Sequence, residues 1–88
     1  MADTAFRALA DPTRRRILEL LAERDRTAGE IASQFSIAFP SVSHHLRVLK
    51  EAELVTAERE GQSIRYRINT TVSQDLVRYL MKLLGRRS

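Results

Sequence analysis

The stretch "AFPSVSHHLRVLKEAELV", residues 38–55, changes its hydrophobic period near its end, and this change decides the fold. Val42, Leu46 and Leu49 recur at helical spacing, which predicts an amphipathic helix from about Pro40 to Ala52. Pro40 is comfortable in a first helical turn and disfavours helical geometry in the residue before it, so the helix begins there after a brief turn.

From Leu54 onward, apolar and polar residues alternate in "LVTAEREGQSIRYRIN", residues 54–69. The alternation predicts two strands joined by a turn near Gly61, with one face toward a core. The residues expected on that face are Val55 and Ala57 on one strand and Ile64, Tyr66 and Ile68 on the other. The opposite face carries Arg65 and Arg67.

Two helices are predicted near the start of the chain. "DTAFRALA", residues 3–10, is a short candidate with Phe6 and Leu9 on one side. In "DPTRRRILELLAER", residues 11–24, Asp11 suits the N-cap and the proline after it suits the first helical position. The expected buried stripe of this second helix is Ile17, Leu18, Leu20 and Leu21.

A short helix of about nine residues is predicted over "TAGEIASQF", residues 27–35, because Thr27 and Glu30 have the spacing of a capping box. Thr71 and Gln74 have the same spacing and are expected to open the last helix.

That last helix, "TVSQDLVRYLMKLLGRRS", is expected to close near Gly85. The predicted order is therefore four helices, a hairpin and a helix. A helix-turn-helix followed by a hairpin is a winged helix, so we expect one mainly α domain over residues 1–88 with a two-stranded β-wing.

Composition narrows the classes of function. The 88 residues carry a net charge of +4 and no cysteine, which excludes disulfides and thiolate metal sites. The opening "MADTAF" has no basic or apolar region of a signal peptide, and no apolar run is long enough to span a membrane. We therefore expect a cytoplasmic protein without a membrane span, while the basic charge fits a polyanionic partner without proving one.

The adjacent histidines of the 38–55 stretch point in different directions. On a helical wheel, His44 shares the side opposite the apolar stripe with Ser43 and Arg47, whereas His45 lies at the edge of the core. Neighbouring histidines diverge by about 100°, so they do not converge on a metal ion. We expect no metal ligand, and no catalytic residue, because no orienting acid or oxyanion loop accompanies the serines.

Two interpretations remain for the outward side chains. They are either an ordinary solvated surface or groups that meet base edges and phosphates in a DNA groove, and the surrounding helix-turn-helix favours DNA. For His45 we favour a half-buried structural imidazole.

Four segments together resemble the ArsR family of winged-helix repressors: "ALADPTRRRILELL", "TAGEIASQF", "PSVSHHLRVLKEAELV" and "EREGQSIRYRIN". "NTTVSQDL" is similar to the metal-independent autorepressor branch of that family. The resemblance implies a homodimer that binds double-stranded DNA at an inverted repeat, often in its own promoter, without a cofactor. The positions it implies for DNA contact are Phe39, Ser41, Ser43, His44 and Arg47 in the recognition helix and Arg59, Gln62 and Arg65 in the wing.

Ala38 and Phe39 depart from the family pattern, which usually has a polar pair at these positions. Ala38 cannot cap a helix, because its side chain has no acceptor. Phe39 either packs beside Phe35, which we favour, or touches a thymine methyl group.

The last helix carries more apolar surface than one chain needs. Its apolar arc spans about 200°, roughly twice the width of a one-sided surface helix. The excess predicts a two-fold subunit contact, with residues of the first helix as co-contributors. The expected interface residues are Phe6, Leu9, Leu76, Val77, Leu80, Met81 and Leu84.

Two other roles compete with DNA-binding repression. A winged helix can serve as a protein-interaction module that docks a regulatory protein partner, although such a wing would expose apolar residues rather than arginines. An enzyme is the more distant alternative, since no pocket signature is present.

Overall fold

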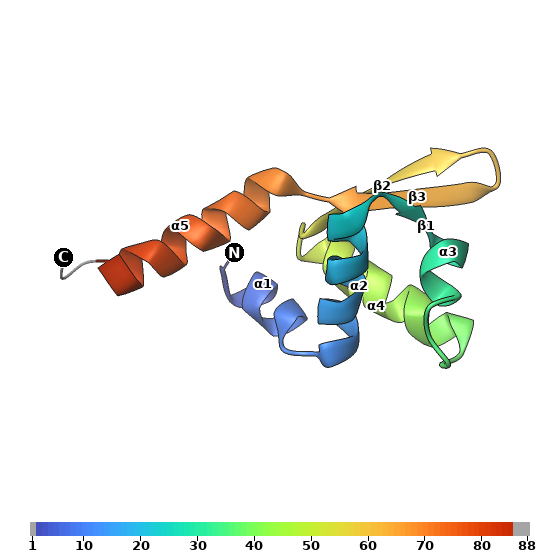
Figure 1. The fold of residues 1–88 in the computed structure, drawn as a ribbon, viewed down its shortest axis with the longest axis horizontal. Coiled ribbons are helices and arrows are strands. Elements are labelled where there is room, and N and C mark those ends of the chain that lie inside the picture. Colours follow the sequence, from blue (N-terminus) through green and yellow to red (C-terminus); the bar gives the residue numbers. More distant parts are fainter. Residues whose placement is uncertain (1, 86–88) are drawn as a thin grey trace.

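A computed structural model of the protein describes residues 2–85 (Figure 1). Its elements, in chain order, are α1 (Ala2–Leu9), α2 (Pro12–Glu23), β1 (Arg26–Thr27), α3 (Ala28–Ala32), α4 (Phe39–Glu51), β2 (Val55–Glu60), β3 (Ser63–Ile68) and α5 (Thr70–Gly85). The order confirms the predicted winged helix-turn-helix, with α3 and α4 as the two helices of the motif and β2–β3 as the wing.

The core lies between α1, α2, α3, α4 and the base of the wing. Val42, Leu46 and Leu49 of α4 are at most 1% exposed, as the helical period predicts. In α1 the fully buried residues are Ala5 and Ala8, whereas Phe6 and Leu9 are half-buried. The small alanines allow α1 to approach the other helices closely and turn its larger side chains toward the rim of the core.

The two predicted caps at the start of α2 and α3 are present. The carboxylate of Asp11 accepts a hydrogen bond of 3.1 Å from the backbone N–H of Arg14. At α3, Thr27 Oγ1 accepts from the Glu30 N–H at 3.2 Å, and Glu30 Oε1 accepts from the Thr27 N–H at 2.8 Å. These bonds satisfy backbone N–H groups that a helix leaves unpaired.

The third helix is shorter than predicted. It spans five residues, and the chain after it closes with tighter bonds from the N–H of Gln34 to the carbonyl of Ile31 and from that of Phe35 to Ala32. The capping pattern therefore located the start of α3, but the apolar spacing overestimated its length.

The wing belongs to a sheet of three strands rather than two. The two residues of β1 pair antiparallel with β3, and the strand order is β1-β3-β2. Two residues are too few to give an alternating pattern, so the sequence did not reveal β1. Arg26 in this strand is 8% exposed, and its guanidinium donates to the Leu20 carbonyl at 3.0 Å and to Glu23 at 2.8 Å.

The expected capping box at the start of α5 is wrong. The helix begins at Thr70, and Asn69 Oδ1 accepts from the N–H groups of Thr71 and Val72 at 3.2 and 3.4 Å. Asn69 is itself a favoured N-cap residue, and it lies two positions closer to the end of β3 than the predicted cap, Thr71. From this cap α5 extends away from α2, α3 and α4 and passes beside α1, and the molecule measures 49 × 24 × 22 Å (Figure 1).

Candidate nucleic-acid interface

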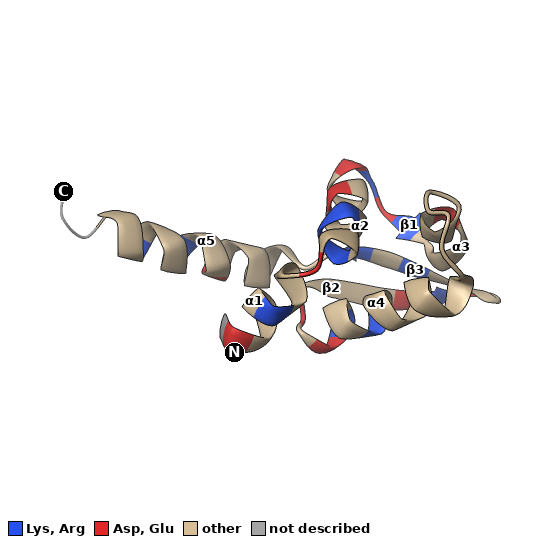
Figure 2. Ribbon diagram, turned by 90° about the horizontal axis from the view of Figure 1, so that it is seen from below, with Lys and Arg blue, Asp and Glu red and all other residues tan. Residues whose placement is uncertain are grey.

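The outward side of α4 presents a short polar surface, which we call the reading face: Ser41, Ser43, His44 and Arg47. Ser41, His44 and Arg47 are exposed and Ser43 is half-buried. The buried residues on the opposite side of the helix hold this face outward. Seen from below, α4 runs along the edge of the molecule, and the tip of the wing projects past its amino-terminal end (Figure 2).

His44 and Arg47 form one connected group. A guanidinium nitrogen of Arg47 lies 3.1 Å from His44 Nδ1. Arginine has no acceptor, so in this contact Nδ1 accepts and the neutral ring carries its proton on Nε2. The pair thus offers an imidazole N–H and the remaining guanidinium N–H groups, which are donors suited to phosphate oxygens and to the acceptors of guanine.

His45 occupies a different environment, as the helical wheel predicts. Its side chain is 16% exposed, and its Nδ1 lies 3.3 Å from Arg14 and 3.9 Å from Asp11. The rings of His44 and His45 are 5.7 Å apart and tilted by 58°. The two histidines therefore share no ligand site and have separate tasks.

Ala38 and Phe39, which stand where the family pattern usually has a polar pair, lie at the start of α4. Ala38 is the N-cap, in an extended conformation, and makes no side-chain hydrogen bond. Phe39 is 52% exposed and lines a cleft of about 250 Å³ with Gln62 and Ile64 of the wing. Within residues 2–85 no ring contact joins it to Phe35.

The residues predicted for the wing do not all lie on one face. Arg59 pairs across the hairpin with Ile64 and shares the face of Val55, whereas Arg65 pairs with Glu58 on the opposite face. Gln62 is exposed in the turn between the strands. The side chains of Arg59 and Gln62 are therefore exposed to solvent at the wing tip, while Arg65 lies on the opposite face of the sheet.

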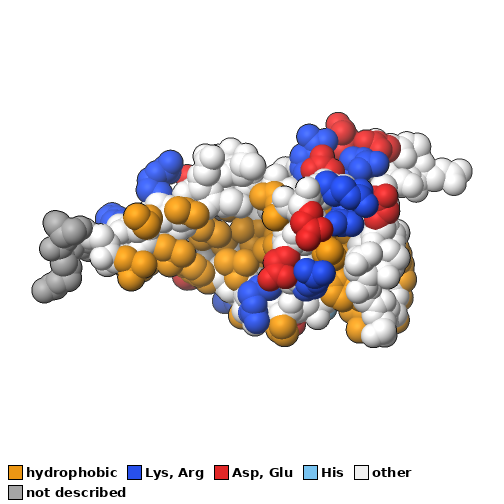
Figure 3. All heavy atoms as spheres, viewed as in Figure 1, with side chains coloured by type: hydrophobic (Ala, Val, Ile, Leu, Met, Phe, Trp, Pro, Cys, Tyr) orange, Lys and Arg blue, Asp and Glu red, His pale blue; other side chains and the backbone are white. Residues whose placement is uncertain are grey.

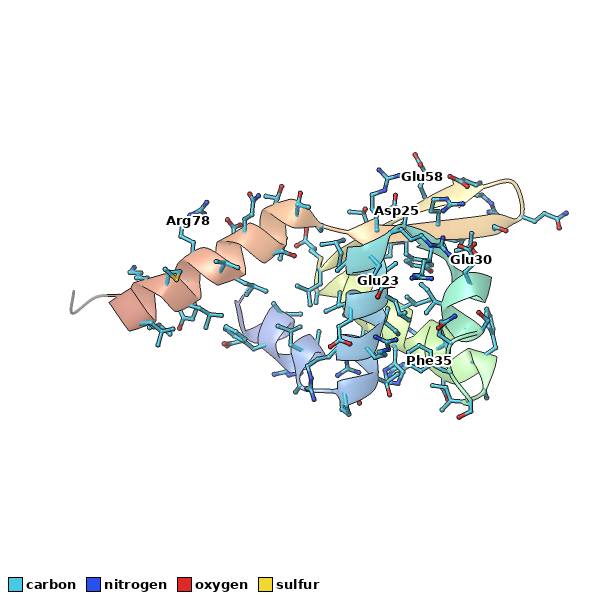
Figure 4. The ribbon with its side chains drawn as sticks, in the orientation of Figure 1. Glu23, Asp25, Glu30, Phe35, Glu58 and Arg78 are labelled. Atoms are coloured by element: carbon cyan, nitrogen blue, oxygen red, sulfur yellow. The ribbon has the colours of Figure 1, made fainter. Side chains whose placement is uncertain are left out.

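The positive charge of Arg65 is also paired with a carboxylate of the same chain. Its Nε lies 3.0 Å from a carboxylate oxygen of Glu60, and this hydrogen bond and charge raise the pKa of Arg65 above its ordinary value. Its neighbour Arg67 lies 3.4 Å from Asp25. Figure 4 shows Asp25, Glu30 and Glu58 around this end of the sheet. A polyanion must compete with these carboxylates for the two arginines.

The structure assigns specific contacts to the arginine run of α2. Arg14 and Arg15 donate to backbone carbonyls at the end of α1, and Arg16 forms an exposed ion pair with Glu19 at 3.2 Å. In the sequence, three consecutive arginines are equally compatible with phosphate contact and with a solvated surface. Cations favour the last turn of a helix, so contact of these arginines with the end of α1 is physically expected. Predicting it, however, required knowing that α2 folds back against the end of α1.

The exposed side of α5 is strongly apolar. Four of the predicted interface residues are 44–81% exposed in the single chain: Val77, Leu80, Met81 and Leu84. Tyr79 and Leu83, which the prediction omitted, are 43% and 53% exposed. Figure 3 shows apolar side chains gathered along α5 and continuing toward the middle of the molecule.

The other predicted interface residues lie where α5 meets the rest of the chain. Leu9 and Leu76 pack against the core and line a groove of about 430 Å³ that Val77 and Leu80 also line. Phe6 contacts Tyr79, with ring centroids 5.9 Å apart. The apolar surface of α5 is thus continuous with that of α1.

Neither metal-site nor membrane-span features are found in the described part of the chain. Residues 2–85 contain no group of three metal-ligating side chains. No helix within the same residues is long and apolar enough to cross a bilayer.

Comparisons with known proteins agree with this geometry. The family model described as bacterial regulatory protein, arsR family, matches residues 11–57. The transcriptional repressor SdpR of Bacillus subtilis is 48% identical over 84 residues, which cover 96% of this chain and 93% of that protein.

Two solved structures support the same relationship. An ArsR-like transcriptional regulator from Rhodococcus superposes with a TM-score of 0.84 at 28% identity, covering 96% of this chain and 79% of that one. The homodimeric winged helix-turn-helix DNA-binding domain Mb0332 from Mycobacterium bovis superposes with a TM-score of 0.77 at 33% identity, covering 92% and 78%.

Proposed function

Because this chain belongs to the ArsR family of bacterial regulatory proteins, we propose that it represses transcription by binding an inverted-repeat operator as a homodimer. The observation that carries the proposal is the reading face of α4, where His44 and Arg47 lie exposed and hydrogen-bonded to each other. A major groove just admits one helix, so such a face can reach base edges. We place the protein in the cytoplasm, where bacterial DNA lies.

The proposal divides the remaining contacts by kind. Ser41 and Ser43 supply short donors beside the reading pair, and Phe39 offers an apolar edge to a thymine methyl group. In the wing, Arg59 and Gln62 are assigned to phosphate or minor-groove contact. Arg65 joins them only by exchanging Glu60 for phosphate, so we expect its share to be the smallest.

The homodimer is part of the proposal. The exposed apolar side chains of α5 give it support, as does the homodimeric state stated for Mb0332. A two-fold dimer presents two copies of α4 to major grooves about one helical turn apart, which requires a nearly palindromic site. We further propose that one such site lies in the promoter of the protein's own gene.

The rival role, docking of a regulatory protein, is less well supported. A docking wing would expose apolar residues, and in β2 and β3 the only large apolar side chain that is exposed rather than half-buried is Ile64, at 40%. A regulatory partner could still relieve repression, but DNA is the partner to which the charges and donors of α4 correspond.

Binding of the purified protein to DNA from upstream of its own gene tests the proposal. Each of His44→Ala and Arg47→Ala should weaken binding by roughly 5- to 150-fold, the effect of losing one good base contact. Arg78→Ala is the matched control, because Arg78 is exposed on α5 and points away from α1 (Figure 4). Unchanged affinity in both α4 variants would refute the reading face.

The salt dependence of binding gives a second readout. If phosphate contacts dominate binding, log affinity should fall steeply as log salt concentration rises, and removal of one contact should lower the slope by about 1. A nearly flat slope for the wild-type protein would exclude phosphate-dominated binding.

A further inference from the structure

One arginine of α2 contacts two other helices at once. Arg14 Nε donates to the carbonyl of Ala8 at 2.7 Å, and Nη2 donates to that of Arg7 at 3.2 Å. Its Nη1 lies 3.3 Å from His45 Nδ1. All three nitrogens of the planar guanidinium are therefore engaged, and the group cannot rotate without disturbing every contact.

At one end of this bridge lies the recognition helix. His45 follows His44 directly and lies two residues before Arg47, so its position fixes the rotation of the reading face. Besides Arg14, its ring faces Asp11, the cap of α2, at 3.9 Å. The start of α2 therefore holds α4 through a half-buried polar contact.

At the other end lies α1, which adjoins the apolar surface of α5. Phe6 of α1 contacts Tyr79 of α5. The last carbonyls of a helix lack its regular backbone partners, and at the end of α1 Arg14 supplies donors and positive charge to those of Ala8 and Arg7, of which the Arg7 carbonyl also accepts from the Ala10 N–H at 3.2 Å. The same guanidinium thus connects the helix beside the proposed subunit contact with the helix proposed to enter DNA.

We propose that Arg14 and His45 are positioning residues for DNA binding: they fix α4 relative to α1, and so set the separation of the two recognition helices in the dimer. This inference rests on the proposed function. It assigns to Arg14 a task different from phosphate contact, and to His45 a task different from reading bases.

The size of the effect follows from population arithmetic. If loss of the bridge leaves each subunit in the binding-competent arrangement about a third of the time, a dimer is competent about a tenth of the time, and affinity falls about tenfold. The loss should be largest for an operator whose half-sites match the wild-type separation.

Arg14→Gln tests this expectation, with Arg15→Gln as the matched control. Both variants lose one positive charge from the same turn, but the Arg15 guanidinium donates to the Leu9 carbonyl at 2.8 Å, and no hydrogen bond within residues 2–85 joins it to α4. Affinity is measured by fluorescence anisotropy at a temperature where circular dichroism shows both variants folded. The probes are the bound upstream DNA and derivatives whose half-sites are one base pair closer or farther apart.

The inference predicts that Arg14→Gln binds the natural spacing about tenfold more weakly and the altered spacings with a smaller loss, while Arg15→Gln changes affinity less than twofold. An equal loss at every spacing would indicate a general structural role and would overturn the inference. Unchanged binding by Arg14→Gln would overturn it as well.

Substitutions of His45 test the other end of the bridge. Asn places an acceptor near the position of Nδ1, whereas Leu fills a similar volume without one. His45→Asn should therefore bind DNA within about threefold of the wild type, and His45→Leu should reproduce the tenfold loss. If Asn and Leu are equally harmful, the acceptor at this position is not what matters.

A measurement without DNA separates this inference from the proposed function. Nitrogen chemical shifts should show the neutral ring of His45 with an unprotonated Nδ1 in the wild type and a changed tautomer balance in Arg14→Gln. A proton on Nδ1 of the neutral wild-type ring would exclude the bridge. Wild-type protein that binds no DNA but shows these shifts would refute the repressor proposal while leaving the contact between Arg14 and His45 established.

Discussion

At the scale of single residues, adjacent side chains of α4 take up unrelated tasks because a helix turns by about 100° per residue. His44 lies in solvent beside Arg47, whereas the next residue, His45, lies against Arg14 and Asp11. The same chemical group therefore lies in solvent at one position, where the proposed function makes it a donor to DNA, and forms an internal polar contact at the other. The direction in which each side chain leaves the helix decides which of the two environments it enters.

Ala38→Ser should raise the free energy of unfolding by up to about 1 kcal/mol, because a serine hydroxyl can accept from the first turn of α4. Pro40 has no N–H, so the group within reach is the N–H of Ser41, which now bonds to the Ala38 carbonyl at 3.0 Å. Urea denaturation measures the change, and Ala38→Val is the control without an acceptor. Equal stability of the two variants would contradict the placement of the cap.

Asp11 makes stability depend on pH. Burial alone would raise the pKa of this carboxyl, but the hydrogen bond from the N–H of Arg14 and the positive charge of the Arg14 side chain help to offset it, so the pKa lies below its ordinary value of 3.8. A lowered pKa in the folded state means that the carboxylate stabilises the fold above pH 4 and loses this contribution as pH falls through the folded value.

Asp11→Asn keeps a capping oxygen and removes the titration. Urea denaturation between pH 5 and pH 2 should therefore show a steeper loss of stability with acid in the wild type than in the variant. Parallel curves would show that Asp11 does not have the lowered pKa.

At the scale of elements, the end of α4 contains a residue in an unfavourable conformation. Glu53 has φ 61°, in the left-handed region where glycine is favoured. Around it, the N–H of Glu53 bonds to the Lys50 carbonyl at 2.9 Å and that of Leu54 to the Leu49 carbonyl at 3.0 Å. This is the Schellman arrangement, which directs the chain from α4 into β2 and usually has glycine at this position.

Glu53→Gly should stabilise the protein by about 0.5 to 1 kcal/mol, since relief of the left-handed strain exceeds the entropy that glycine adds to the unfolded chain. The thermal midpoint measures the gain. Glu51→Gly, inside the last turn of α4, is the control and should destabilise the helix by a similar amount. A lower midpoint for Glu53→Gly would mean that the side chain of Glu53 contributes more than its backbone costs.

At the scale of the whole molecule, α5 gives the single chain a surface that water solvates poorly. Met81 and Leu84 are 62% and 81% exposed, and they continue an apolar face shared with α1. Large contiguous apolar patches on a soluble protein mark interaction sites, and a two-fold contact would bury the patch of each subunit against that of the other.

Met81→Asp should convert the proposed dimer to a monomer and weaken operator binding roughly 100-fold or more, because each half-site is then bound independently. The fold of the monomer should persist, since Met81 contributes little to the core of its own chain. Sedimentation velocity and anisotropy measure the two effects. Lys82→Asp, on the polar side of α5, should remain dimeric; a dimer in Met81→Asp would place the subunit contact elsewhere.

The sequence by itself determined the order of the helices and the two wing strands, and the direction of the α4 side chains. Both follow from local rules, namely hydrophobic period, capping residues and turn chemistry, which act over a few neighbouring positions. The buried stripe of α4 and the outward direction of His44 were predictable in this way, whereas α4 begins at Phe39, one residue before the predicted Pro40.

Tertiary structure alone decided the features that join distant segments. The pairing of β1 with β3, the contact of Arg14 with His45 and the ion pair that occupies Arg65 each depend on how elements pack. No periodicity records such contacts, because an arginine in a polar stretch has the same local pattern whether it faces water, a carboxylate or a helix end. Which of these it meets is fixed only when the chain has closed around its core.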